Sequence, residues 1–355
     1  MSKQEQGIIL SENLAVNLKQ AIDRCPHDKL FILTDEHTSR LCTPRLWKIG
    51  YLSGMKEFVI GAGDTHKTLD TLASIWTWLS NSGATRHSLL LNLGGGMVTD
   101  LGGFAAATFK RGFPYINIPT TLLAMVDASV GGKTGINFNG LKNEIGVFAP
   151  ASSVLIDVRF LSSLDHHNLL SGYAEMLKHG LISTESHWAE LLRFDPKQVD
   201  YDRLHEWIGK SVQVKKAIVE QDPFEHGIRK ALNLGHTVGH AFESLALKEN
   251  RPVLHGYAVA WGLVCELYLS HIQTGFPVNK MMQTIRFIKE NYGTFDMNCQ
   301  HYETLYEFML HDKKNAAGTI NFTLLEDVGR ISINQTTDRE TLYGMFDFYR
   351  DCISM

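Results

Sequence analysis

Two histidines four residues apart, His236 and His240, give the first chemical signal in this chain. A helix is expected to begin near Asn233, and residues at this spacing share one face of a helix. Such a pair can hold a metal ion, although histidines so spaced are often unrelated. Glu175, on an apolar helical stripe, and His255, in a Leu-His-Gly turn, could complete the set. One carboxylate and two imidazoles would leave a coordination position open, as a catalytic zinc site requires.

A glycine-rich turn is the second signal. Residues 94–97 read Gly-Gly-Gly-Met and follow the apolar run 88–93, which is expected to be a buried strand. Glycines let a ligand approach the backbone, and amides at a helix N-terminus favour an anion such as pyrophosphate, although many such turns are purely structural. The chain beyond them is small and apolar but carries polar side chains at Asp100, Arg111, Thr120, Thr121, Asp127, Lys133, Lys142 and Asn143. Charges in such a setting are unfavourable unless they meet a partner or a ligand.

Composition narrows the class of protein. The length of 355 residues favours two domains. The net charge of −4 argues against a nucleic-acid partner, whose footprint would be a basic excess. Five cysteines are widely spread with no C-x-x-C pair, as expected of reduced thiols in a cytoplasm. Neither a secretion signal nor an apolar run of about 18 residues is visible, so we expect a cytoplasmic protein with no membrane partner.

The order of predicted elements changes near residue 165. Before it, strands are expected at 29–34, at the end of 51–60, and at 88–93, 115–118 and 154–158, with a helix over 72–79. This alternation predicts a parallel, doubly wound sheet that binds ligands at the carboxyl ends of its strands. After it, helical periodicity covers 169–181, 203–220, 229–248, 256–273 and 279–291, followed by a hairpin at 319–334 and a helix at 338–350. The predicted fold class is therefore α/β plus all-α.

Several sequence blocks carry a resemblance to a known family. They are GGGMVTD (94–100), KRG (110–112), IPTTLLAMVDASVGGKTGIN (118–137), GLKNEIG (140–146), GYAEMLKHG (172–180), LNLGHTVGHAFE (232–243), LHGYAVAWG (254–262) and DKKN (312–315). In these blocks the chain resembles the 3-dehydroquinate synthase family of sugar phosphate cyclases. The resemblance implies a Rossmann-like NAD-binding domain over 1–165 and a mainly helical metal- and substrate-binding domain over 166–355.

The same resemblance implies a role for individual residues. Glu175, His236 and His255 would bind Zn²⁺ or Co²⁺, whereas His240 and Glu225 would handle protons. NAD⁺ would contact Asp64, Lys67, Gly95, Gly96, Met97, Asp100, Thr120, Thr121, Lys142, Phe160 and Ser163. Substrate would contact Arg111, Asp127, Lys133, Asn143, Lys178, Lys215, Arg229, Asn233 and either Lys313 or Lys314.

The implied reaction belongs to the shikimate pathway of aromatic amino acid biosynthesis. A phosphorylated seven-carbon sugar acid, 3-deoxy-D-arabino-heptulosonate 7-phosphate, would become 3-dehydroquinate and phosphate, with NAD⁺ regenerated in each turnover. The enzyme would thus be a lyase, and the resemblance implies a homodimer. Three alternatives stay open: another sugar phosphate cyclase, a metal-dependent polyol dehydrogenase of related fold, and a nucleotide-binding module that has lost catalysis.

The remaining charged residues near these blocks have simpler interpretations. His166, His167, His179 and His187 are expected on the surface or in loops, and Glu243 and Glu266 are expected to be solvated or to support the metal ligands. Tyr257 is a departure, since the family often has glutamate at this position. It is expected to adjust the site without abolishing its function.

Overall fold

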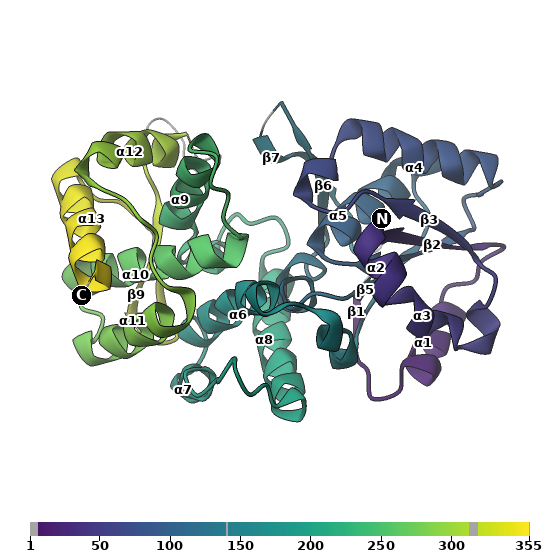
Figure 1. The fold of residues 1–355 in the computed structure, drawn as a ribbon, viewed down its shortest axis with the longest axis horizontal. Coiled ribbons are helices and arrows are strands. Elements are labelled where there is room, and N and C mark those ends of the chain that lie inside the picture. The colour runs from purple at the N-terminus through teal and green to yellow at the C-terminus, as the bar shows by residue number, and fades with distance from the viewer. Residues whose placement is uncertain (1–5, 140, 312–318, 355) are drawn as a thin grey trace. The chain divides into compact units, whose positions relative to one another are not determined.

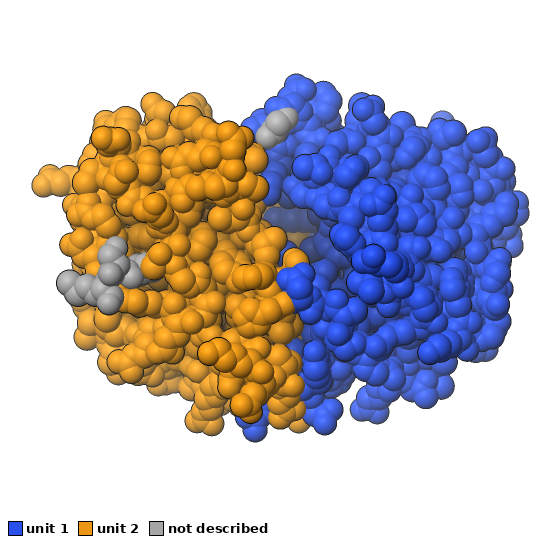
Figure 2. All heavy atoms as spheres, in the orientation of Figure 1, with its two compact units in different colours: residues 1–165, 201–205 blue, residues 166–200, 206–355 orange. Residues whose placement is uncertain are grey.

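A computed structural model describes residues 6–139, 141–311 and 319–354. The chain forms two compact units, coloured separately in Figure 2. Residues 1–165 and 201–205 make up the first, called here the sheet unit, and residues 166–200 and 206–355 make up the second, the helical unit. None of the described helices is both long and apolar enough to span a membrane.

The sheet unit is built on six parallel strands. They are β1 (Gly7–Leu10), β2 (Leu30–Asp35), β3 (Lys56–Ile60), β4 (Leu89–Gly94), β5 (Tyr115–Pro119) and β8 (Ser153–Ile156), in the spatial order β1-β8-β5-β4-β2-β3. The strand order reverses between β2 and β4, since β3 lies outside β2 and β5 lies outside β4. Ligands of open α/β sheets bind in the crevice at such a reversal. The glycine turn at the end of β4 lies at this position.

Helices connect these strands, as the sequence predicts for a doubly wound sheet (Figure 1). They are α1 (Leu14–Asp23), α2 (Glu36–Leu41), α3 (Thr43–Trp47), α4 (Leu69–Asn81) and α5 (Gly96–Thr108), with short 3₁₀ segments at Gly50–Leu52, Asp64–His66, Phe109–Arg111 and Val158–Ser163 and a π turn at Ala124–Ala128. The predicted α/β class is confirmed.

An antiparallel hairpin between β5 and β8 was not predicted. Its strands are β6 (Lys133–Phe138) and β7 (Leu141–Phe148), with a register irregularity after Ile136. Every residue of β7 is exposed, so its sequence lacks the apolar and polar alternation that reveals a half-buried strand.

The helical unit is organised around one buried helix. Its elements are α6 (His166–Leu181), α7 (Glu185–Leu191), α8 (Tyr201–Gln221, whose first residues belong to the sheet unit), α9 (His236–Lys248), α10 (His255–Thr274), α11 (Val278–Tyr292), α12 (Tyr302–Leu310) and α13 (Arg339–Ser354), with the hairpin β9 (Phe322–Asp327) and β10 (Arg330–Gln335). Helix α10 contacts α6, α9, α11, α13 and β9 (Figure 1). It is apolar on nearly every side, as expected of a central helix.

The helix predicted over 229–248 is interrupted. Residues Ile228–Asn233 form a 3₁₀ turn, Gly235 has a φ of 79°, and α9 begins only at His236. Glycine reaches this left-handed conformation without steric strain. Helix α9 therefore begins close to the start expected near Asn233, and His236 lies in its first turn.

Glycines let α10 approach its neighbours at the level of the backbone. A Cβ on Gly256 would overlap the Ser171 carbonyl oxygen of α6, and one on Gly262 would overlap the Gly235 carbonyl oxygen. Backbone atoms cannot yield as a flexible side chain can. Both contacts therefore fix the spacing of the helices that carry Glu175, His236 and His255.

Replacing Gly262 with alanine is expected to push α10 away from the start of α9. Overpacking typically lowers the free energy of unfolding by about 1–3 kcal/mol. The loss at Gly262 should lie near the top of that range, because the atom that a new Cβ would meet belongs to the backbone. Thermal unfolding measures the effect. Gly344→Ala is the matched control, because nothing lies within 4 Å of a Cβ at that position in α13. A Gly262→Ala protein that melts at or above the wild-type temperature would contradict the close packing.

Candidate metal and cofactor sites

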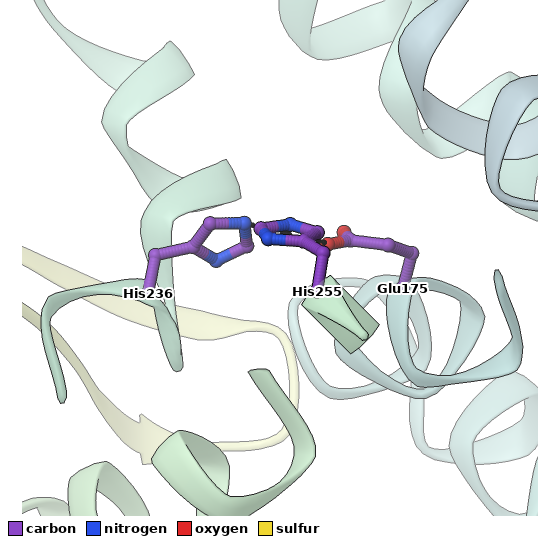
Figure 3. A group of neighbouring side chains, drawn as sticks. All are labelled: Glu175, His236 and His255. Carbon is purple, nitrogen blue, oxygen red and sulfur yellow. Dashed lines mark ion pairs between the residues drawn. The ribbon is translucent and has the colours of Figure 1, made fainter. Parts of the chain in front are cut away.

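Three helices bring Glu175, His236 and His255 together (Figure 3). Glu175 comes from α6, His236 from the first turn of α9 and His255 from the first residue of α10. Glu175 Oε1 lies 3.3 Å from His236 Nε2 and 3.4 Å from His255 Nε2. One ligand atom from each residue lies within 4.8 Å of the others. A carboxylate and two imidazoles thus face one common point, although they are far apart along the chain.

The Glu175 carboxylate is charged although it is completely buried. Burial opposes its ionisation, but Lys178 and His236 outweigh it and hold the pKa of this carboxyl well below its usual range. Oε2 accepts a hydrogen bond from Lys178 Nζ, one turn along α6. Oε1 accepts no hydrogen bond from any of the described residues. An ionised oxygen that faces two imidazole nitrogens fits a divalent cation.

The two imidazoles are held so that Nε2 faces this oxygen. His236 Nδ1 lies 3.1 Å from the Leu234 carbonyl oxygen, and His255 Nδ1 lies 3.4 Å from Glu243 Oε2. An oxygen behind the ring typically orients a metal-binding histidine. Burial lowers the pKa of His255, but Glu175 and Glu243 raise it to about 10. A cation at Nε2 would therefore have to displace a proton.

Glu266 is not solvated but supports the site, the second of the two roles expected for it. It is completely buried on α10 and accepts hydrogen bonds from the backbone N–H groups of Gly235 (2.6 Å) and Val238 (3.1 Å). The first N–H groups of a helix lack partners within that helix. Glu266 therefore caps α9 beside His236. An acid within the apolar run 258–269 was the available signal, since a buried carboxylate must find donors.

Two histidines expected on the surface or in loops are buried, so that prediction was wrong. His179 lies inside α6, and His187 lies in α7, where its Nε2 is 3.2 Å from Ser211 Oγ. Burial lowers the pKa of His187 to about 4. Both helices are covered by neighbouring elements, which local sequence does not reveal. His166 and His167 are exposed, as expected.

His240 lies beside the three candidate ligands. Its ring centroid is 5.4 Å from that of His236 and 5.9 Å from that of His255. It is only partly buried, one turn along α9. A group so placed can exchange a proton with a molecule bound at this site.

The other candidate residues of the helical unit lie on α6, α8 and the loop before α9. Asn233 Nδ2 donates to Glu225 Oε1 at 2.9 Å, and Glu225 has a positive φ of 63°. Arg229 is buried and donates to the Pro223 carbonyl oxygen at 2.5 Å. Lys178 and Lys215 are buried as well. Lys313 and Lys314 lie outside the described residues.

In the sheet unit, a buried lysine joins two predicted contact residues. Lys67 Nζ lies 2.5 Å from Asp100 Oδ2 and also donates to Asn143 Oδ1. Asp64 accepts a hydrogen bond from Asn137 at 3.0 Å. These contacts tie the β6–β7 hairpin to α5 and to the loop before α4. Lys142 Nζ is 3.7 Å from Asp64 Oδ2.

The glycine turn and its neighbours surround the start of α5. Gly95 precedes the first turn, which contains Gly96 and Met97, and Thr120 donates its backbone N–H to the Gly94 carbonyl oxygen at 3.0 Å. A Cβ on Gly95 would lie 3.1 Å from Thr121. Gly95 and Gly96 thus add no side chains of their own at the start of this helix, where backbone amides suit an anionic ligand.

The remaining candidates of the sheet unit lie in short helical turns or at the start of a strand. Phe160 and Ser163 belong to the 3₁₀ segment after β8, Asp127 belongs to the π turn, and Lys133 begins β6. Arg111 has a φ of 70°, and Gly112 follows it. Left-handed backbone at a non-glycine residue is uncommon and is concentrated at functional sites.

Comparison with known proteins identifies the class. The sequence pattern described as 3-dehydroquinate synthase N-terminal matches residues 57–171, and the C-terminal pattern matches 172–315. The chain is 54% identical to 3-dehydroquinate synthase of Parabacteroides distasonis over 98% of each protein. In structure it is similar to 2-epi-5-epi-valiolone synthase of Streptomyces hygroscopicus with NAD⁺ and Zn²⁺ bound (TM-score 0.86, 24% identity, 99% of this chain and 98% of that one). It is also similar to a 2-deoxy-scyllo-inosose synthase complexed with carbaglucose-6-phosphate, NAD⁺ and Co²⁺ (TM-score 0.84, 22% identity, 97% and 96%).

The fold is therefore that of the sugar phosphate cyclases. Within that class, the sequence matches are more specific than the fold. The chain belongs to the 3-dehydroquinate synthase family.

Replacing Glu175 with glutamine tests the metal site. The amide keeps the shape of the side chain but removes the charge, so zinc affinity should fall by more than the roughly 10- to 100-fold typical when only a supporting partner of a ligand is lost. Competition with a chromophoric chelator measures it. Glu290→Gln, on the exposed side of α11, is the control. Equal zinc binding by the two variants would remove Glu175 from the site.

Proposed function

We propose that this chain is a 3-dehydroquinate synthase, which converts 3-deoxy-D-arabino-heptulosonate 7-phosphate to 3-dehydroquinate and phosphate. The family membership sets the reaction. The observation that carries the proposal is the convergence of Glu175, His236 and His255, because the reaction needs a Lewis acid. The enzyme is a lyase of the shikimate pathway.

In the helical unit, Glu175, His236 and His255 hold the metal ion in this proposal. A divalent cation, Zn²⁺ or Co²⁺, would supply polarisation of a substrate hydroxyl. His240, whose ring lies beside that of His236, would take up or return a proton of that substrate, and Glu225, which accepts a hydrogen bond from Asn233, is a second candidate for proton transfer.

Cations around this site would bind the anionic groups of the substrate. Lys178, Lys215 and Arg229 are buried, where ionic hydrogen bonds to phosphate and carboxylate are strong. Four residues of the sheet unit are further proposed substrate contacts: Arg111, Asp127, Lys133 and Asn143. Either Lys313 or Lys314 completes the proposed set. The lysines and arginines of this set suit a substrate that carries both a phosphate and a carboxylate.

Residues 1–165 form the NAD-binding domain in this proposal, and residues 166–355 bind metal and substrate. NAD⁺ would supply a hydride acceptor that is restored before product leaves. The bare amides of Gly95, Gly96 and Met97 would hold the pyrophosphate. The other proposed contacts are Asp64, Lys67, Asp100, Thr120, Thr121, Lys142, Phe160 and Ser163.

We also propose a homodimer in the cytoplasm. Strand β7 exposes Leu141, Ile145, Val147 and Phe148, and among the described residues it pairs only with β6. A second copy could cover this apolar edge, which would otherwise favour aggregation. All five cysteines are free thiols, which suits a reducing compartment. A solution mass equal to one chain would rule out the dimer.

The activity is tested by incubating the protein with the heptulosonate phosphate, NAD⁺ and zinc. Inorganic phosphate and the carbocyclic product should appear in equal amounts, with no net NADH, because the hydride returns to the substrate. His236→Ala should abolish phosphate release, because it removes one metal ligand. His271→Ala, a partly exposed histidine near the end of α10, is the control and should stay active.

Each rival function gives a different result in this assay. A polyol dehydrogenase would accumulate NADH with a polyol substrate. A different cyclase would release phosphate from another sugar phosphate but not from the heptulosonate. A nucleotide-binding module would bind NAD⁺ with no turnover, and His236→Ala would leave that binding unchanged.

A further inference from the structure

Successive turns on one face of α6 contact successive residues in the first turn of α10. His167, Ser171 and Glu175 are spaced four apart and share this face. Gly256 donates its backbone N–H to Ser171 Oγ at 3.0 Å, and its Cα lies so close that a Cβ would overlap the Ser171 carbonyl oxygen. One turn further along α6, His255 faces Glu175, with 3.4 Å between Nε2 and Oε1. The placement of α10 on this face therefore determines where His255 lies.

Tyr257 of α10 makes the third of these contacts, with His167 at the start of α6. Its hydroxyl lies 2.9 Å from His167 Nδ1. Its ring packs edge-on against Tyr292 and Trp261, at centroid distances of 5.2 and 5.9 Å. Tyr292 is itself fixed, because its hydroxyl donates to the Leu170 carbonyl oxygen at 2.9 Å. The Tyr257 side chain thus has both its ring and its hydroxyl held.

We propose that Tyr257 and His167 are a positioning pair for the metal centre. Their hydrogen bond clamps the first turn of α10 to α6 two helical turns from Glu175, and so maintains the separation between His255 and Glu175. Neither residue is one of the three that converge on the metal site. This inference rests on the metal centre of the proposed function, and it assigns a purpose to the tyrosine that departs from the family pattern.

The test measures zinc affinity of metal-free protein by competition with a chromophoric chelator. Tyr257→Phe removes the hydroxyl and keeps the ring, and His167→Leu removes the partner. Each should weaken zinc binding by about 3- to 10-fold, less than the loss of a direct partner of a ligand. The double variant should bind as weakly as either single one, because both remove the same bond. Tyr343→Phe is the control, since it deletes a surface hydrogen bond to Glu303 on α12.

Thermal melting of the metal-free proteins separates positioning from general stability. The proposal expects the metal-free variants to melt close to the wild type, with a smaller stabilisation by zinc. It is overturned by wild-type affinity in both variants, by losses that multiply in the double variant, or by early unfolding that accounts for the weaker binding. Failure of the wild type to bind zinc would instead remove the proposed metal centre itself, and the positioning role with it.

Discussion

A charged carboxylate inside the protein is the constraint on which the helical unit depends. Glu175 is completely buried, and an isolated ionised group there would be strongly unfavourable. Lys178 compensates one oxygen, and the other faces His236 and His255. Removing one partner of such a group usually destabilises more than the pair itself stabilises. The surrounding helices must therefore keep these partners in place, and the close glycine contacts of α10 fix the spacing of those helices.

The sheet unit also contains a buried charge held by partners, but here the charge is positive. Lys67 is buried, and its ammonium group is shared between Asp100 on α5 and Asn143 on β7. Strand β7 of the hairpin is exposed, whereas β6 packs against α5. Through Lys67 and Asn137, residues proposed to contact cofactor and substrate are fixed relative to one another. In both units, then, a buried charge positions residues that come from distant parts of the chain.

Local sequence predicted the elements that have clear periodicity. The apolar stripe of 169–181 predicted α6, and short apolar runs predicted β2, β4 and β5. It predicted the late hairpin within 319–334 but not the β6–β7 hairpin, because the exposed strand β7 shows neither strand nor helix periodicity. The break at Gly235 was also missed, because a single glycine within a helical pattern does not by itself indicate a left-handed turn. The convergence of Glu175, His236 and His255 came from the resemblance, since spacing relates only His236 to His240. The burial of His179 and Glu266 depends on neighbouring helices, which no local pattern describes.

The most direct measurement is anomalous diffraction at the zinc absorption edge from crystals of the zinc-loaded protein. We expect a single strong peak about 2.0–2.2 Å from Glu175 Oε1, His236 Nε2 and His255 Nε2, with one coordination position left for another ligand. A peak elsewhere, or these three side chains turned to separate places around an ordered zinc ion, would contradict it.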